Sequence, residues 1–155
     1  GTGGVAEYTR MRCGEVPGWA HLHQNMTFEE AGGLAVAGMT AVMGFERSQV
    51  QRGDEVLVLG ASGGCGMFGV MVAARSLGAT VTGLCSGRNA EFVRGLGAAR
   101  VVDYTNATDV AGLREGGARF DVIYDTVSSS AAVDPDYEPE MRPLLKPGGR
   151  YLAIG

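Results

Sequence analysis

Short runs of apolar residues alternate with longer segments of mixed polarity over residues 54–155, and this alternation predicts strands and helices in turn. Five runs are rich in β-branched or aromatic residues and are bounded by Gly, Pro or polar residues, which is typical of buried strands. The strands are expected at Glu55–Leu59, Thr80–Cys85, Arg100–Val102, Phe120–Tyr124 and Arg150–Ile154. The mixed segments predict helices at Met67–Leu77, Asn89–Leu96, Thr108–Arg114 and Glu138–Leu145.

Strands that are apolar along their whole length and alternate with helices favour a parallel sheet covered on both faces. Because crossover connections are right-handed, such a sheet is doubly wound, and it leaves a crevice outside the carboxyl ends of its strands. The predicted fold class is therefore α/β, with a Rossmann-like sheet. Two mononucleotide-binding halves comprise six strands, whereas five are predicted here, so the sheet is expected to be incomplete.

The first part of the chain follows a different pattern. Residues 1–25 show little periodicity and predict a short strand at Val5–Arg10 before an extended segment. A helix is expected to begin after Thr27, whose hydroxyl can cap it, with acidic residues in the first turn and small apolar residues as far as Phe45. We therefore expect residues 1–25 to be the end of a preceding domain with a linker, and residues 26–155 to be the sheet domain, cut short at its C-terminus.

Composition narrows the class of partner. The 155 residues are 45% hydrophobic and 19% charged, which is typical of a folded protein, and the net charge of −4 gives no electrostatic basis for binding nucleic acid or an anionic membrane. The apolar runs are all shorter than a membrane span.

No targeting segment follows Gly1, so the compartment, cytoplasm or mitochondrial matrix, stays open. Unpaired sheet edges predict pairing with a missing strand or with a second copy in a homodimer.

Glycine is the residue in excess, at 26 of 155 positions, more than twice its usual share of about 7%. The turn over residues 60–66, with the sequence GASGGCG, lies between a predicted strand and a predicted helix. In that setting backbone N–H groups and the positive end of the helix face an anion, and glycine lets the backbone approach a diphosphate. Gly63 and Gly66 match the last two glycines of the dinucleotide-binding fingerprint, and Ala61 stands in place of the first. The alternative is a tight strand-to-helix connection without a ligand.

Three other functions share parts of this pattern. A hydrolase nucleophile elbow would make Ser62 the nucleophile, but it needs a later histidine, and His21 and His23 both come earlier. A P-loop needs a lysine after the last glycine, where Met67 stands. The stretch Leu145–Arg150 before the fifth strand resembles that of methyltransferases, which favour an acid at the end of the second strand to hold ribose hydroxyls.

The end of the second strand indicates which nucleotide is bound. No Asp or Glu follows this strand to accept a hydrogen bond from a ribose 2′-hydroxyl, as NAD binding would favour. Ser86 and Arg88 follow instead, and a hydroxyl with a guanidinium can hold a 2′-phosphate by charge-assisted hydrogen bonds. NADP(H) is therefore favoured over NAD(H). The alternative for Arg88 is a solvated side chain at the start of the next helix.

Metal and thiol sites have weaker support. His21 and His23, even with Cys13, fall short of a four-ligand set, so no metal site is expected. Cys85, at a strand end near Arg88, is either a reactive thiol or, as we expect, a small core residue. No tyrosine is followed four residues later by lysine, which excludes a short-chain dehydrogenase site in this segment.

Several segments together resemble one family. Gly53–Gly66 and Leu96–Tyr104 are similar to the nucleotide-binding segments of medium-chain dehydrogenases/reductases, in particular the zinc-free quinone oxidoreductases and their reticulon-4-interacting type. Phe28–Ala31 and Val36–Ala41 match the inter-domain helices of that family, and Gly4–Tyr8 matches the last strand of its GroES-like catalytic domain. The resemblance covers nearly the whole chain and implies that it lacks most of that catalytic domain.

The resemblance implies hydride transfer from NADPH to a small-molecule substrate, a quinone or an activated double bond, with NADP(H) as cofactor. The cofactor-binding residues implied along the turn are Ser62 and, at the diphosphate, Gly63, Gly64, Cys65 and Gly66. Those implied around the adenosine 2′-phosphate are Ser86, Arg88 and Tyr104. Thr40 is implied to lie near the nicotinamide, and Asp125, Thr126 and Val127 are implied to line the crevice. The alternative for Tyr104 is a strand-end aromatic without a ligand.

The chain departs from the family at Cys65, where Val is usual, although a small buried residue is tolerated there. Because the family's substrate-facing residues lie mostly in its catalytic domain, no catalytic residue is identified. No ligand set is found for the zinc of the related alcohol dehydrogenases. A non-catalytic NADPH-binding or scaffold module in a larger assembly is the second hypothesis, and an S-adenosylmethionine-dependent methyltransferase is the third.

Overall fold

The computed structural model describes the chain from His21 onward with two gaps. The described residues are 21–115, 119–128 and 136–154. The chain divides into two compact units between Gly32 and Gly33. The strand predicted at Val5–Arg10 and the cysteine Cys13 lie outside the described residues. No described helix is both long and apolar enough to cross a lipid bilayer.

Helix α1 (Phe28–Arg47) begins where the sequence predicts it. The Glu30 N–H donates to Thr27 Oγ1 (3.2 Å), and the Thr27 N–H donates to the Glu30 carboxylate (2.9 Å). This capping box stabilises the start of the helix, because it satisfies N–H groups that a helix leaves without partners. Further along the helix, the small residues Ala41 and Gly44 are buried.

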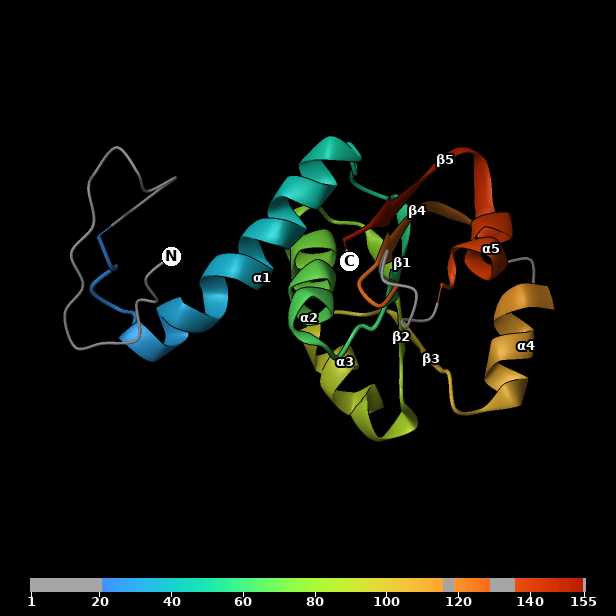
Figure 1. Ribbon diagram of the computed structural model, residues 1–155, viewed down its shortest axis with the longest axis horizontal. Coiled ribbons are helices and arrows are strands. Elements are labelled where there is room, and N and C mark those ends of the chain that lie inside the picture. The colour runs from blue at the N-terminus through green and yellow to red at the C-terminus, as the bar shows by residue number, and fades with distance from the viewer. Residues whose placement is uncertain (1–20, 116–118, 129–135, 155) are drawn as a thin grey trace. The chain divides into compact units, whose positions relative to one another are not determined.

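Within the described residues, five strands form one parallel sheet (Figure 1). They are β1 (Glu55–Leu59), β2 (Thr80–Cys85), β3 (Arg100–Asp103), β4 (Phe120–Asp125) and β5 (Leu145–Ala153). Their order is β3-β2-β1-β4-β5, and every neighbouring pair is parallel. The chain winds outward from β1 to β3 and then returns to the other side of β1 for β4 and β5, as a doubly wound sheet does. The predicted fold class and the five strands are confirmed.

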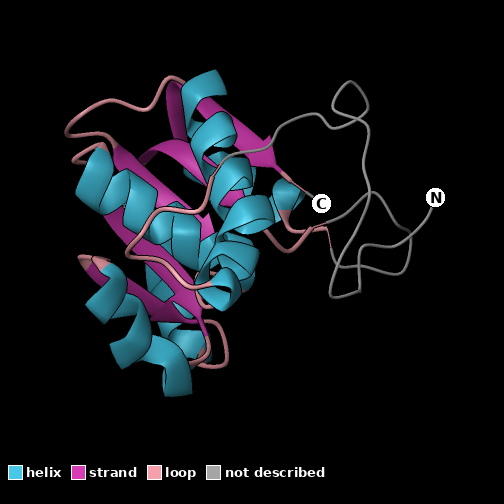
Figure 2. Cartoon of the chain, turned by 90° about the vertical axis from the view of Figure 1, so that its left-hand side faces the viewer, coloured by secondary structure: helices cyan, strands magenta, loops and turns pink. Residues whose placement is uncertain are grey.

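Helices cover both faces of this sheet (Figure 1, Figure 2). The helices after β1 to β4 are α2 (Gly64–Met71) with its π-helical continuation Val72–Ser76, α3 (Ala90–Leu96), α4 (Ala107–Glu115) and α5 (Glu138–Met141). Side chains of β1 alternate between the faces: Val56 and Val58 join the core under α1, α2 and α3, and Leu57 and Leu59 join the core under α4 and α5.

Several helix boundaries differ from the predicted ones, most of all in α2 and α5. Helix α2 begins at Gly64 rather than at Met67, so the last part of the glycine turn is already helical. Helix α5 ends at Met141 and passes into a 3₁₀ turn over Arg142–Leu144. The cause is Pro143, which has no N–H with which to continue the α-helical hydrogen bonds.

Strand β5 is longer than the predicted Arg150–Ile154. Leu145 already pairs with Phe120 of β4, and the next paired residue is Arg150. The segment between them forms a bulge in which Gly148 has φ +80°, a conformation that favours glycine. The stretch Leu145–Arg150, which is expected to precede the fifth strand, is therefore part of β5 and contains its irregularity.

Candidate functional site

A cleft of about 950 Å³ opens at the carboxyl end of the sheet. The turn after β1, the ends of β1 and β2, the loop after β4 and parts of α1, α4 and α5 contribute to its lining. The predicted site residues that line it are Ser62, Gly63, Gly64, Cys65, Tyr104, Thr126 and Val127. Those outside its lining are Thr40, Gly66, Ser86, Arg88 and Asp125. The fold thus brings loops that are far apart in the sequence into one crevice.

The glycine turn presents backbone rather than side chains to the cleft. Gly60 has φ +70°, and the Gly63 N–H donates to the Gly60 carbonyl oxygen at 2.9 Å, which closes the turn. A Cβ on Gly66 would overlap that same oxygen, so the start of α2 packs against the turn only because residue 66 is glycine. A Cβ on Gly64 would meet no atom within 4 Å, since this glycine borders the open cleft.

The first turn of α2 brings positive partial charge to the cleft. Gly63 is the N-cap residue, and no side chain caps this end of the helix. The N–H groups at the start of a helix have no partner within it, and together with the helix dipole they attract anions. Gly63 and Gly64 are exposed and Cys65 is partly exposed, so an anion can approach these N–H groups from the cleft.

The turn lies where the winding of the sheet changes direction. β1 and β4 are neighbours, but the helices that follow them, α2 and α5, pack on opposite faces. A Cβ on Gly60 would come within 2.6 Å of Val127 Cγ2 and 2.7 Å of Thr126 Oγ1, so the two loops are in direct contact. The Thr126 hydroxyl also donates to the Leu59 carbonyl oxygen (2.7 Å). Open α/β sheets bind their ligands at such a switch point.

Asp125 lies behind the cleft rather than in it. Its buried carboxylate accepts hydrogen bonds from the Tyr151 hydroxyl (2.6 Å) and from the N–H groups of Val127 (2.9 Å) and Ser128 (3.0 Å). Burial would raise the pKa, but these hydrogen bonds outweigh it and hold the pKa of Asp125 below its ordinary value. Asp125 therefore fixes the loop on which Thr126 and Val127 reach the cleft, and a cofactor-binding role for Asp125 stays a prediction.

Thr40 lies one turn along α1 from two residues that line the cleft, Val36 and Ala37. Its hydroxyl donates to the Val36 carbonyl oxygen (2.8 Å), which is a common arrangement for threonine within a helix. Its position near a nicotinamide stays a prediction.

At the end of β2, the side chain of Asn89 joins Ser86 to the glycine turn. The Asn89 amide group donates to Ser86 Oγ (3.2 Å) and to Ser62 Oγ (3.1 Å). Ser86 is buried, whereas Ser62 lines the cleft. The sequence did not single out Asn89, because it stands at an expected helix start and one of its partners is 27 residues away. Only the pairing of β1 with β2 brings these residues together.

Arg88 and Tyr104 come from the ends of neighbouring strands. Arg88 is exposed and makes no hydrogen bond or ion pair with any other described residue. Tyr104 is 57% exposed and lines the cleft. A guanidinium without a protein partner is available to an anion from solution.

An acidic side chain reaches the end of β2 from the neighbouring strand. Asp103 of β3 is in register with Cys85 of β2, and a Cβ on Gly87 would overlap the Asp103 carboxylate. This carboxylate accepts hydrogen bonds from the Thr105 hydroxyl (2.7 Å) and N–H (2.9 Å), which lower the pKa of Asp103. Sequence reasoning missed this carboxylate, because it considered only acids that directly follow β2.

The two described cysteines differ in environment. Cys65 lines the cleft and is partly exposed, whereas Cys85 is buried. Burial, followed by the Asp103 carboxylate, raises the pKa of the Cys85 thiol, which supports the expected core role rather than a reactive thiol. In the part of the chain that the structure describes, no three His, Cys, Asp or Glu residues lie close enough to hold a metal ion.

Helices α4 and α5 complete the cleft with residues that sequence reasoning did not include. These residues are Val110 and Arg114 from α4, and Tyr137, Glu140 and Met141 from the region of α5. Arg114 and Glu140 form an ion pair between the two helices. No local motif marks these positions, because they meet only when both helices cover the same face of the sheet.

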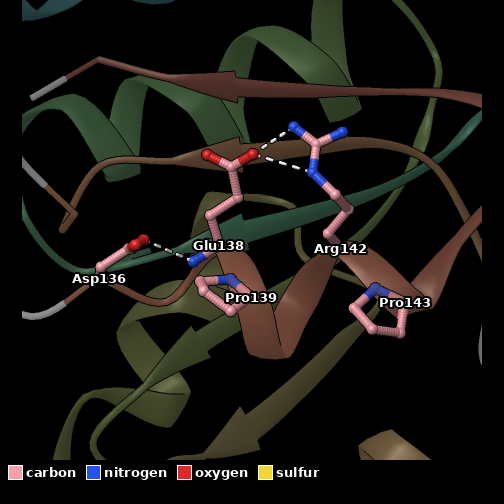
Figure 3. Close-up of a pocket in the computed structure, with 5 residues that line it drawn as sticks. All are labelled: Asp136, Glu138, Pro139, Arg142 and Pro143. Carbon is pink, nitrogen blue, oxygen red and sulfur yellow. Dashed lines mark hydrogen bonds and ion pairs between the residues drawn. The ribbon is translucent and has the colours of Figure 1, made fainter.

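A second pocket, of about 460 Å³, lies around α5 (Figure 3). Its lining residues are Asp136, Glu138, Pro139, Arg142 and Pro143. The Asp136 carboxylate accepts a hydrogen bond from the Glu138 N–H (3.0 Å), and the Arg142 guanidinium pairs with the Glu138 carboxylate. Because these charged groups are engaged with one another, the cleft at the glycine turn is the better candidate for a ligand site.

Known proteins resemble this chain over nearly its whole length. No family model matches it. It is 32% identical to the trans-enoyl reductase pgmF of Aspergillus terreus, a match that covers 99% of this chain and 41% of that protein. It is 30% identical to the chloroplastic NADPH-dependent alkenal/one oxidoreductase of Arabidopsis thaliana, over 98% of this chain and 36% of that protein.

The solved structures give the same result. The quinone oxidoreductase from Thermus thermophilus, which was also solved as a complex with NADPH, superimposes with a TM-score of 0.68 and 28% identity. This match covers 86% of the present chain and 42% of the other. The chain spans about 40% of the length of the curated relatives it matches.

Proposed function

Because this chain belongs to the medium-chain dehydrogenase/reductase superfamily, among its quinone and enoyl reductases, we propose that its cleft binds NADPH. The observation that carries this proposal is the glycine turn. Its exposed N–H groups and the uncapped start of α2 face a cleft at the switch point of the sheet. Backbone N–H groups in this arrangement are the usual means by which this type of fold holds a diphosphate.

The residues present fit a dinucleotide. Gly63 and Gly64 leave the space beside the turn free of side chains, so Ser62, Gly63, Gly64 and Cys65 would hold the diphosphate. Gly66 would act indirectly, because the absence of its side chain allows α2 to begin close against the turn.

A 2′-phosphate would be held by Ser86, Arg88 and Tyr104. The support is that the Arg88 guanidinium is exposed and unpaired among the described residues, while the nearby Asp103 carboxylate is engaged by Thr105. An arginine free to form charge-assisted hydrogen bonds favours the phosphorylated ribose of NADPH over the ribose hydroxyl of NADH.

When bound, NADPH supplies a hydride, and we propose that it passes to a quinone or to a double bond activated by a carbonyl. The support is that relatives of this chain are named as a trans-enoyl reductase, an alkenal/one oxidoreductase and a quinone oxidoreductase. Thr40 of α1 and the loop that carries Thr126 and Val127 would border the nicotinamide. The reaction is proposed without zinc, since a hydride acceptor of this kind is already activated.

Nucleotide titration of this chain tests the proposal. The fluorescence of NADPH should change on binding, and NADH should bind more weakly. Arg88→Ala should weaken NADPH binding by about tenfold or more, as expected for a hydrogen bond between charged groups, and should leave NADH nearly unchanged. Arg100→Ala is the matched control, because Arg100 is exposed at the opposite, amino end of β3. Equal affinity of the chain for NADPH and NADH would contradict the 2′-phosphate assignment.

Turnover separates the proposed enzyme from a binding module. The full-length protein that contains this chain should oxidise NADPH in the presence of a quinone or an α,β-unsaturated ketone. Tight NADPH binding without turnover of either acceptor would favour the second hypothesis, a non-catalytic NADPH-binding or scaffold module.

A further inference from the structure

Two threonine hydroxyls near the cleft are committed to the protein itself. The Thr40 hydroxyl donates its proton to the Val36 carbonyl oxygen (2.8 Å). The Thr126 hydroxyl donates to the Leu59 carbonyl oxygen (2.7 Å). These protons are therefore not free to bind a ligand.

Ser62 and Ser86 differ from them. The oxygen of each hydroxyl accepts a hydrogen bond from the Asn89 amide group, at 3.1 Å and 3.2 Å, and neither hydroxyl donates to another described residue. A serine hydroxyl has one proton to donate in addition to its acceptor lone pairs. Because Asn89 occupies a lone pair on each oxygen, both protons point away from Asn89.

Asn89 is itself held in place. Its backbone N–H donates to the Ser86 carbonyl oxygen (2.9 Å), which closes the 3₁₀ turn Gly87–Asn89 directly after β2. Its side chain is partly buried between that turn and the glycine turn. One side chain thus connects the loop of the proposed diphosphate site with the loop of the proposed 2′-phosphate site.

We infer that Asn89 is a positioning residue. It keeps the hydroxyls of Ser62 and Ser86 available as hydrogen-bond donors to the phosphate groups of NADPH. Ser62 donates to the diphosphate and Ser86 to the 2′-phosphate. The inference rests on the proposed function, since it requires that NADPH binds in this cleft. An aspartate in place of Asn89 would accept both hydroxyl protons and turn them away from the ligand.

Dissociation constants for NADPH and NADH, measured by nucleotide fluorescence, test this inference. Ser62→Ala should weaken the binding of both nucleotides by a similar factor, whereas Ser86→Ala should weaken the binding of NADPH alone. Asn89→Ala should weaken NADPH binding by about tenfold and NADH binding by a smaller factor. The substitution disturbs two hydrogen-bond donors to NADPH but only one to NADH. Gln51→Ala removes an exposed amide group outside the cleft and should change neither constant.

Non-additivity distinguishes positioning from a merely structural effect. In a Ser62→Ala/Ser86→Ala background, Asn89→Ala should weaken NADPH binding by less than about twofold more. The two hydroxyls through which Asn89 acts are absent from that background. If Asn89→Ala does not fold, Asn89→Asp replaces it, and Ser86→Ala should then cause no further loss of NADPH affinity. Additive losses of NADPH affinity in either series, or unchanged NADPH affinity of the Asn89 variant, would overturn the role of Asn89 but leave the proposed function in place. If the unmodified chain binds neither nucleotide, the proposed function fails as well.

Discussion

At the scale of single residues, two glycines of the same turn have different tasks. Gly66 lacks a Cβ because one would overlap the Gly60 carbonyl oxygen, so its role is packing within the protein. Gly64 faces open space, so nothing in the described part of the protein requires glycine there. The ligand-access role proposed for Gly64 therefore differs from the packing role of Gly66, and this difference can be measured.

Gly66→Ala should lower the free energy of unfolding by about 1–3 kcal/mol, the usual cost of forcing an extra methyl group into a packed site. Gly64→Ala should leave the free energy of unfolding nearly unchanged but weaken NADPH binding, because its methyl group enters the space proposed for the diphosphate. Chemical denaturation and nucleotide titration of both variants provide the comparison. Equal stability of the two variants would show that the turn is not packed as described.

Asp125 should make stability depend on pH. Its folded-state pKa is lowered, so the stabilisation is complete above the unfolded pKa of about 3.9 and is lost as pH falls through the folded value. Asp125→Asn should be less stable at pH 7 by about 1–3 kcal/mol and should lose less stability than the unmodified chain on acidification. Urea unfolding between neutral and acid pH measures both effects. The exposed Asp136→Asn serves as control, and an acid dependence in Asp125→Asn as steep as in the unmodified chain would contradict the assignment.

At the scale of elements, α1 and α2 pack on β4 around one aromatic ring. The ring of Tyr124 is fully buried, with its centroid 4.9 Å from that of Phe45. Gly44 of α1 and Gly69 of α2 border this ring, and a Cβ on Gly69 would come within 2.6 Å of it. Both helices approach the sheet closely because these two positions carry no side chain.

Tyr124→Phe should raise the free energy of unfolding by about 1 kcal/mol. In the described part of the chain the Tyr124 hydroxyl is buried without a hydrogen-bond partner, and burial raises its pKa. Removing this hydroxyl eliminates the cost of an unsatisfied polar group and keeps the ring in place. Tyr151→Phe is the contrasting variant, since it loses the 2.6 Å hydrogen bond to Asp125 and should destabilise. A destabilised Tyr124→Phe would mean that its hydroxyl is satisfied.

The sequence located the elements better than their ends. Apolar runs such as Glu55–Leu59 and Thr80–Cys85 have the observed bounds, because burial on both faces of the sheet requires an uninterrupted apolar strand. The start of α2 at Gly64 was missed, since glycine is a poor helix former and its helical conformation here depends on packing against the turn. The predicted fifth strand is shorter than β5, because the bulge within β5 is visible only through its pairing with β4.

At the scale of the whole molecule, the sequence could propose the part of the candidate site that is local in sequence, but not the part that only folding brings together. The glycine turn and Arg88 follow directly after strands, where the fold class itself places ligand-binding loops. Asn89, Asp103 and Arg114 reach the region through strand pairing or helix layering. No spacing in the sequence marks such contacts.

The order of the strands leaves β3 and β5 at the edges of the sheet in the described part of the chain. Unpaired edge strands tend to associate with another strand. Pairing of an edge with a further strand or with a second copy of the chain stays a prediction. Analytical ultracentrifugation should show a concentration-dependent dimer if a second copy pairs there, and a monomer at all concentrations would argue against it.

The response of individual backbone N–H groups to nucleotide, measured by two-dimensional NMR of the 155-residue chain, tests directly whether NADPH binds at the glycine turn. NADPH should cause its largest shifts at Gly63, Gly64 and Cys65, and it should shift Arg88 where NADH does not. Shifts confined to the pocket around α5, or no shift along the glycine turn at saturating NADPH, would contradict NADPH binding at this turn.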